Sequence, residues 1–262
     1  NTIIFFGVGF MRWFSVILVL AVLSATVFAV DVSACRDLNE SATYTLNQSI
    51  NQSITINGTT CFNVTAQNVL LDCAGFSILS NNTTNTFGIY TNQTNTTVRN
   101  CIVTAFQTGV YFNNSNNGTI QNTTVNTTHP AGYGIYLLGS SRNLITGSTA
   151  YSSAYYGIRI HTGSNFNTIT GTNVLNSLIG ISIDSGSNNT IANSTATSTG
   201  SNYAIVLSSN ANNTITNVTA ITNNDAALYF GSSNSNTISN TTVSSPASGF
   251  RLSSSSNNLI QN

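Results

Sequence analysis

A unit of about 23 residues recurs along most of the chain, and this repeat limits the possible folds more than any other feature. Its copies align on a glycine that alanine replaces twice: Gly88, Gly109, Gly134, Gly157, Gly180, Ala204, Ala227 and Gly249. Eight copies at a near-constant period are typical of a solenoid, in which each unit packs mainly against its neighbours. The sequence therefore predicts an extended stack of coils.

Apolar and polar residues alternate within each copy, which indicates strands and not helices. The first and third residues after the glycine are apolar, as in Ile158 and Ile160, so the second should face outward. A later isoleucine is followed, two positions on, by Asn or Gly, which tolerate the left-handed backbone conformation. These predicted corner residues are Asn100, Asn122, Gly147, Gly171, Asn193, Asn217, Asn240 and Asn262. Asp72 occupies the equivalent place in an earlier coil, so we expect a corner role for it as well.

The fold class that follows is all-β, a single-stranded right-handed parallel β-helix. Three short strands in each coil would stack on their counterparts at about 4.8 Å, the spacing between strands of a sheet. The right hand follows from the general hand of connections between parallel strands. The asparagine two residues before the later isoleucine recurs as well, and its stacked amides should bond to each other along the axis. The members of this predicted ladder are Asn143, Asn167, Asn189, Asn213, Asn236 and Asn258.

Charge is nearly absent from the chain. Its 262 residues include six Arg, no Lys and six acidic residues, so the formal net charge is zero. A chain without a basic surface lacks the electrostatic attraction that binding to a nucleic-acid backbone requires, so nucleic acid is not expected as a partner. Hydrophobic residues make up 40% of the chain, which is too many for a disordered polar segment.

Residues 1–29 are almost entirely apolar and are predicted to be a secretory signal peptide that starts at Met11. Arg12 supplies the basic start of such a signal, and small residues near Ala29 supply a cleavage site. The alternative is an uncleaved anchor over residues 13–30, which is close to the minimum length for a membrane span. In both cases the membrane would be contacted only through this segment.

Three regions are predicted to follow one another. After the signal, residues 30–60 match no copy of the repeat and are expected to cap the solenoid, because an open coil exposes strand edges. Residues 61–262 form the β-helix, which stops inside a copy and is expected to be truncated at its C-terminal end. This organisation predicts a secreted, extracellular or cell-surface protein.

Four cysteines, all in the first part of the chain, are disulfide candidates in an exported protein. Cys73 and Cys101 follow the corner in consecutive coils and should stack, either as a disulfide or as a buried pair of thiols. Cys35 lies in the predicted cap and Cys61 opens the first coil, so a bond between them would fix the cap to the solenoid. Four cysteines allow three pairings, and the sequence alone does not choose among them.

The stretch CFNVTAQNVLLDCAGFSI, followed by GIY, VRNC and repeated S-x-x-N-x-I lines, resembles microbial right-handed parallel β-helix proteins. These proteins are described as NosD-type, after a periplasmic copper-binding protein, or as pectate-lyase-like. The resemblance covers residues 35–262 and implies the fold, which hosts lyases, hydrolases, adhesins and assembly factors. Phe76 and Ser77 depart from the family pattern, in which the LDC-x-G segment commonly continues with His.

One cluster of ionisable residues is a weak candidate for catalysis. Arg159 and His161 lie two residues apart and should share one face of a strand, with Asp184 in the His161 column one coil later. A histidine beside a carboxylate can act in acid–base chemistry, but a solvated ion pair explains the same three residues. Glycoside hydrolysis usually needs two facing carboxylates, and Asp184 and Asp225 fall about two coils apart in different columns.

Neither a metal site nor a cofactor is expected. Copper sites use Met, Cys and His. The single Met is Met11, in the predicted signal, and His129 and His161 are more than one coil apart.

The predicted partners are carbohydrate or other cell-surface components. Tyr90, Tyr111 and Tyr136 occupy the outward position in three consecutive coils, where they could stack against sugars or could merely favour a strand. Attached glycans are a separate prediction. The acceptor motif N-x-S/T occurs outside the repeat at Asn39, Asn47, Asn51 and Asn57, which are glycosylation candidates.

The predicted function is that of a secreted or cell-surface β-helix module, structural, adhesive or carbohydrate-binding, and non-catalytic in this segment. The alternative is a carbohydrate-active enzyme, a polysaccharide lyase or hydrolase, whose catalytic coils lie outside residues 1–262. A weaker alternative is a NosD-like periplasmic assembly factor for a metalloenzyme. The oligomeric state is not predicted.

Overall fold

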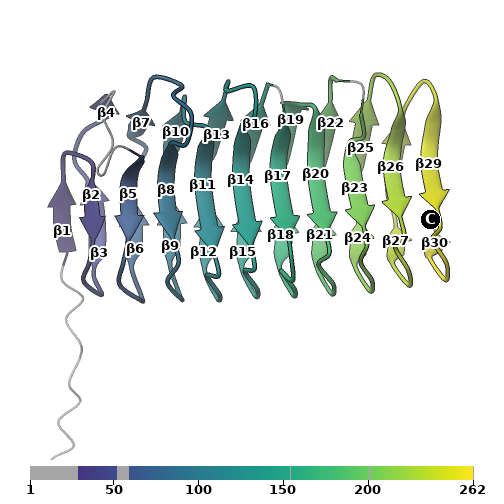
Figure 1. Cartoon of the computed structure of the whole chain (residues 1–262), viewed down its shortest axis with the longest axis horizontal. Coiled ribbons are helices and arrows are strands. Elements are labelled where there is room, and N and C mark those ends of the chain that lie inside the picture. The colour runs from purple at the N-terminus through teal and green to yellow at the C-terminus, as the bar shows by residue number, and fades with distance from the viewer. Residues whose placement is uncertain (1–28, 52–58, 154, 201, 262) are drawn as a thin grey trace, which may run out of the picture.

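The computed structural model describes residues 29–51, 59–153, 155–200 and 202–261, and within these ranges the regular elements are all short strands. The strands form coils that stack along one axis, from β1 at one end to β29 and β30 at the other (Figure 1). Neighbouring strands in each of the three sheets pair in parallel. The predicted all-β parallel solenoid is confirmed. Nearly all of the predicted signal peptide lies outside the described residues, and among those that are described no helix could cross a membrane.

A complete coil contributes one strand to each of three sheets, named A, B and C here, and the coils at the two ends contribute fewer. Sheet A has eleven strands: β1 (Ala29–Val32), β3 (Thr43–Leu46), β6 (Leu70–Asp72), β9 (Thr97–Arg99), β12 (Thr119–Gln121), β15 (Leu144–Thr146), β18 (Thr168–Thr170), β21 (Thr190–Ala192), β24 (Thr214–Thr216), β27 (Thr237–Ser239) and β30 (Leu259–Gln261). Sheet B has ten strands: β2 (Arg36–Leu38), β5 (Thr60–Val64), β8 (Phe87–Thr91), β11 (Thr108–Asn113), β14 (Tyr133–Leu138), β17 (Tyr156–His161), β20 (Ile179–Asp184), β23 (Ile205–Ser208), β26 (Ala226–Gly231) and β29 (Ser248–Ser253). Sheet C has nine strands: β4 (Ile50–Asn51), β7 (Ser77–Leu79), β10 (Ile102–Thr104), β13 (Thr124–Thr127), β16 (Thr149–Ser152), β19 (Asn173–Ser177), β22 (Thr195–Ser198), β25 (Thr219–Thr222) and β28 (Thr242–Ser244).

The core is a narrow column of side chains between the three sheets. Ile158 and Ile160 of sheet B point inward and are fully buried, as is Ile169 of sheet A. In most copies the repeated glycine leaves room for a close approach of the strands of sheets C and B. A Cβ atom at Gly109, for example, would collide with the side chain of Val125 and the carbonyl of Gly134.

The predicted corners are confirmed. Seven of the Asn and Gly residues have positive φ angles, between 47° and 58°, while Asn262 lies outside the described residues. The members with these angles are Asn100, Asn122, Gly147, Gly171, Asn193, Asn217 and Asn240.

The prediction for Asp72 is wrong in its position. Leu71, and not Leu70, pairs with Val98, so Asp72 ends strand β6 in register with Arg99, one residue before the corner column. The residues with positive φ at this corner are Ala74 and Gly75. The Asp72 carboxylate instead accepts hydrogen bonds around the corner, from the Ala74 N–H at 2.9 Å and from Asn100 Nδ2 at 3.0 Å.

The ladder of asparagines is confirmed as a chain of buried hydrogen bonds. Nδ2 of Asn143 donates to Oδ1 of Asn167 at 3.1 Å, and the same oxygen accepts the backbone N–H of Asn143 at 2.8 Å. The pattern recurs between Asn167 and Asn189, at 3.1 and 2.8 Å. Each of these amides therefore bonds both to a buried backbone group of a neighbouring coil and to the next side chain of the ladder.

The first described strands already belong to the three sheets. Strand β1 pairs with β3, β2 with β5 and β4 with β7, so the segment 30–60 contributes strands to the solenoid. A capping role for this segment stays a prediction. Disulfides join Cys35 to Cys61 and Cys73 to Cys101.

Candidate functional site

The outer face of sheet B carries one continuous row of side chains, because successive strands pair in register. The row contains Asn63, Tyr90, Tyr111, Tyr136, Arg159, Ser182, Val206, Tyr229 and Arg251, in that order along the axis. The three tyrosines of the sequence analysis are thus direct neighbours on β8, β11 and β14.

A second outward row lies beside the first, and the sequence analysis missed it. Tyr133 and Tyr156 precede the repeated glycine and pair with each other across β14 and β17. Strict alternation would put Tyr133 and Tyr136, three residues apart, on opposite faces. Gly134 and Ile135 are both buried, however, which leaves both tyrosines outside. The signal in the sequence was the aromatic residue before the glycine, which recurs as Phe87, Tyr133, Tyr156 and Tyr203.

These residues form an aromatic strip, defined here as Phe87, Tyr90, Tyr111, Tyr133, Tyr136 and Tyr156. The rings of Tyr111 and Tyr136 are stacked with centroids 5.0 Å apart, and those of Tyr133 and Tyr136 with centroids 4.7 Å apart. Tyr133 also stacks on Tyr156 at 5.7 Å. Each ring keeps part of its surface exposed, so the strip offers aromatic faces and edges to a ligand.

Burial raises the pKa of Tyr111 to about 12, and the neighbouring Tyr136 and Tyr90 add to this. Burial also raises the pKa of Tyr133, although the nearby Arg159 opposes the shift. The phenols of Tyr111 and Tyr133 therefore stay neutral and can donate and accept hydrogen bonds at physiological pH.

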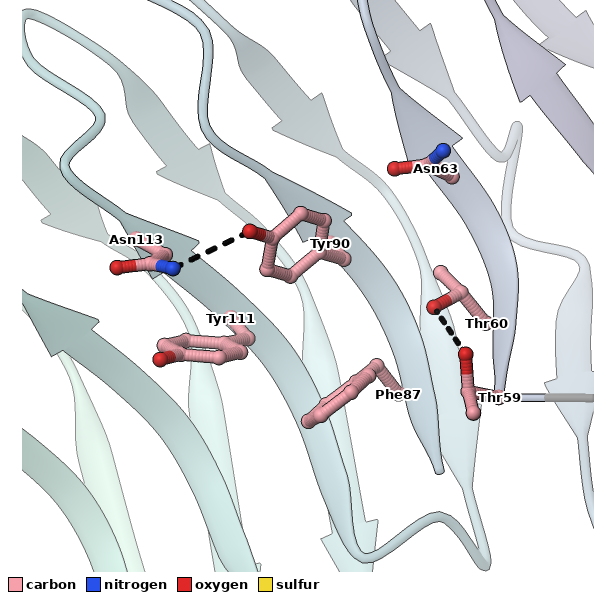
Figure 2. A pocket seen from close by; sticks show the side chains of 7 residues that line it. All are labelled: Thr59, Thr60, Asn63, Phe87, Tyr90, Tyr111 and Asn113. Carbon is pink, nitrogen blue, oxygen red and sulfur yellow. Dashed lines mark hydrogen bonds between the residues drawn. The ribbon is translucent and has the colours of Figure 1, made fainter. Parts of the chain in front are cut away.

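One end of the strip opens into a hollow of about 400 Å³ over β5, β8 and β11 (Figure 2). Its lining residues are uncharged: Thr59, Thr60, Asn63, Phe87, Tyr90, Tyr111 and Asn113. Nδ2 of Asn113 donates to the Tyr90 hydroxyl at 3.2 Å, which leaves that O–H free to donate. Polar groups thus surround two tyrosine rings and one phenylalanine ring, without a charge among them.

Arg159 lies at the other end of the strip. Its guanidinium carbon is 4.8 Å from the ring centroid of Tyr156 and 5.9 Å from those of Tyr133 and Tyr136. Nε donates to Asp184 Oδ2 at 2.9 Å. Burial lowers the pKa of Arg159, but Asp184 and Tyr156 outweigh this and raise it, so the guanidinium stays charged.

His161 pairs in register with Asp184, as the repeat predicted, but does not bond to it closely. Its Nδ1 lies 3.9 Å from Asp184 Oδ2 and, within the described part of the chain, is buried without a hydrogen bond. Burial and the charge of Arg159 lower the pKa of His161, against the opposite effect of Asp184. Arg159 forms an ion pair with the Asp184 carboxylate, and His161 stays neutral beside this ion pair.

A second group of similar composition lies further along sheet B. Tyr203 and Tyr229 are stacked with centroids 4.5 Å apart, and the guanidinium of Arg251 lies 5.8 Å from the Tyr229 ring. NH1 of Arg251 is 3.4 Å from Asp225 Oδ2. The sequence did not predict this group, because Asp225 lies just before strand β26 and Tyr203 belongs to the aromatic column that was missed.

Metal ligands do not gather in the described ranges, where no three His, Cys, Asp or Glu side chains come together as a metal site would require. His129 lies before β14, with Nε2 3.2 Å from the Thr84 hydroxyl. Of the glycosylation candidates, Asn39, Asn47 and Asn51 are exposed, and Asn57 lies outside the described residues.

The family model for the right handed beta helix region matches residues 108–262, more than half of the chain. No curated protein matches the sequence. Among solved structures, the A-module of the mannuronan C-5 epimerase AlgE4 from Azotobacter vinelandii matches with a TM-score of 0.60 and 10% identity, over 89% of this chain and 76% of that one. The enzymatically active domain of tailspike protein 2 from bacteriophage CBA120 gives 0.61 and 14%, over 89% and 41%. The periplasmic alginate epimerase AlgG gives 0.58 and 14%, over 76% and 54%. At these identities the likeness concerns the fold alone.

Proposed function

The chain belongs to the right-handed β-helix family, and from this premise we propose that it is a secreted or cell-surface module that binds carbohydrate on the outer face of sheet B. In this proposal the segment holds its ligand and does not transform it. The aromatic strip is the observation that carries the proposal.

Sugar rings present apolar C–H faces and a rim of hydroxyl groups. The rings of Tyr111 and Tyr136 stack on each other, and their half-buried side chains offer exposed ring carbons for the first and hydroxyl groups for the second. Asn63 and Asn113, at the hollow, add amide groups that donate and accept hydrogen bonds. A site made of aromatic walls with a few polar groups is the usual composition of a small-molecule site.

Three further observations support the proposal. The names of two structural neighbours describe epimerases of mannuronan and alginate, which are polysaccharides. The two disulfides fit a chain that folds in an oxidising, exported environment. A rigid parallel solenoid also suits a surface module, because its strands are hydrogen-bonded along the whole axis.

The test is binding to a glycan array, followed by titration of the glycans that bind. Tyr111→Ala removes the central ring of the strip, and we expect at least tenfold weaker binding. Tyr151→Ala is the matched control, since Tyr151 lies on β16 of sheet C and points outward there. Thermal unfolding of both variants separates lost binding from lost folding. Unchanged binding by folded Tyr111→Ala would overturn the proposal.

A carbohydrate-active enzyme is the second candidate, and the unbonded Nδ1 of His161 favours it. A neutral imidazole beside Arg159 and a tyrosine could accept a proton from a bound sugar. The test is product analysis after incubation with neutral glucans and with polyuronides. Activity that His161→Ala abolishes would establish catalysis within this segment, and full retention of activity would place the catalytic residues elsewhere.

A further inference from the structure

We propose that the ligand is an uncharged polysaccharide that lies along the solenoid axis and binds at two related clusters on sheet B. The first cluster consists of Tyr133, Tyr136, Arg159 and Asp184, and the second of Tyr203, Tyr229, Arg251 and Asp225. This inference rests on the proposed carbohydrate-binding function and adds the class of the ligand, its direction and a second site.

The two clusters share a stacked tyrosine pair, an arginine and an aspartate, although Tyr203 and Asp225 come from coils other than the equivalents of Tyr133 and Asp184. In each, two tyrosine rings are stacked, with centroids 4.7 Å apart for Tyr133 and Tyr136 and 4.5 Å apart for Tyr203 and Tyr229. In each, an arginine from the next strand lies 5.8 or 5.9 Å from the ring of the outward tyrosine. That arginine is in register with the tyrosine in both cases, as Tyr136 with Arg159 and Tyr229 with Arg251.

The shared row fixes the direction of the ligand. From Tyr136 the row passes through β17, β20 and β23 before it reaches Tyr229 on β26, a distance of four strands. Four strand spacings of about 4.8 Å place the clusters about 19 Å apart along the axis. Between them stand Ser182 and Val206, which are uncharged, buried and not aromatic. Only a ligand that runs along the axis can contact both clusters.

The charges indicate an uncharged ligand. Arg159 is paired with Asp184 at 2.9 Å and Arg251 with Asp225 at 3.4 Å, so each cluster is neutral as a unit. A carboxylate or sulfate on the ligand would have to compete with an aspartate for each guanidinium. The hollow, further along the same row, also has no charged lining residue. Paired Arg and Asp side chains can still donate to and accept from sugar hydroxyls.

The experiment is isothermal titration calorimetry of the whole chain with gluco-, manno- and galacto-oligosaccharides of increasing length, and with oligouronates for comparison. Two linked sites raise the apparent affinity of a ligand that spans both, by about 10²- to 10⁴-fold. We therefore expect a rise of at least tenfold once the oligosaccharide exceeds about 19 Å. Shorter oligosaccharides should bind at each cluster separately.

Two single variants locate the sites. Tyr136→Ala and Tyr229→Ala should each remove one binding site for short oligosaccharides and abolish the gain in affinity with length. Tyr151→Ala, on sheet C, should change neither. Thermal unfolding confirms that each variant is folded.

The contrary outcomes separate this inference from the proposed function. Length-independent affinity, or long-chain binding that Tyr229→Ala leaves intact, would overturn the two-cluster inference while carbohydrate binding stands. Tighter binding of oligouronates than of neutral oligosaccharides would overturn the uncharged ligand. If neither class of oligosaccharide binds, the proposed function falls together with the inference.

Discussion

Two regions of the solenoid build the same coils with different internal bonds. Between residues 35 and 101 two disulfides link neighbouring coils, and between residues 143 and 258 the coils are linked by the asparagine ladder. The ladder column holds Thr96 and Gly118 in the coils before Asn143, and no cysteine occurs after Cys101. Parallel backbone pairing therefore specifies the coil, and each region adds its own bond between coils.

The two kinds of bond act on different states of the chain. A disulfide stabilises chiefly by restricting the unfolded chain, and it depends little on the packing around it. The ladder acts in the folded state, where each buried amide satisfies backbone and side-chain groups of adjacent coils. Loss of one ladder amide should therefore lower the free energy of unfolding more than loss of one disulfide. Loss of a disulfide should instead loosen the whole loop that it closes.

The largest effect is expected from Asn189→Ala, in the middle of the ladder. The substitution removes the acceptor of the Asn167 N–H at 2.8 Å and of its Nδ2 at 3.1 Å, and the donor to the Ser164 carbonyl at 3.0 Å. A buried polar group without a partner costs about 1–3 kcal/mol, so we expect a loss of about 3–5 kcal/mol in the free energy of unfolding. Denaturant titration measures it.

Asn173→Ala is the control for the ladder. Asn173 begins β19 with an exposed side chain, and the substitution should cost less than about 0.5 kcal/mol. Equal losses for the two variants would mean that the ladder adds nothing beyond the strand pairing.

A smaller and more localised effect is expected from Cys73→Ala combined with Cys101→Ala. The disulfide closes a loop of 28 residues, and the chain-entropy relation gives about 3.6 kcal/mol for a loop of this size. Because solenoid coils contact mainly their neighbours, faster amide hydrogen exchange should be confined to the strands near β6 and β9. Faster exchange in the ladder coils β18–β27 to the same extent would contradict the separation of the two regions.

The sequence predicted what the repeat itself specifies: the inward isoleucines, the left-handed corners and the amide ladder. It did not predict what departs from the period. Of the two consecutive leucines Leu70 and Leu71, the second pairs with Val98, so Asp72 falls one residue before the predicted corner. Gly134 and Ile135 both face inward, so Tyr133 lies on the outer face, where strict alternation would not place it. The second cluster combines residues of three coils, and only the register of the strands brings them together.

The smallest effects are expected from acid, which should reach the two regions in different pH windows. His161, in the ladder region, has a lowered pKa in the folded chain, so the unfolded chain binds more protons below its ordinary pKa near 6.5. Stability should therefore fall as the pH is lowered from about 7 through this window. The region around β17 should show it first in hydrogen exchange, and His161→Gln should remove the dependence.

Asp72, in the disulfide region, should respond only to stronger acid. Burial raises its pKa, but hydrogen bonds from Ala74, Asn100 and Arg99 outweigh this and lower it below the ordinary value of 3.8. Its contribution is complete above that value and is lost as the pH falls through the lowered pKa. Asp72→Asn should flatten the stability profile below about pH 4 and leave the window near pH 6 unchanged. A variant that altered the upper window instead would show that the two regions do not respond separately to acid.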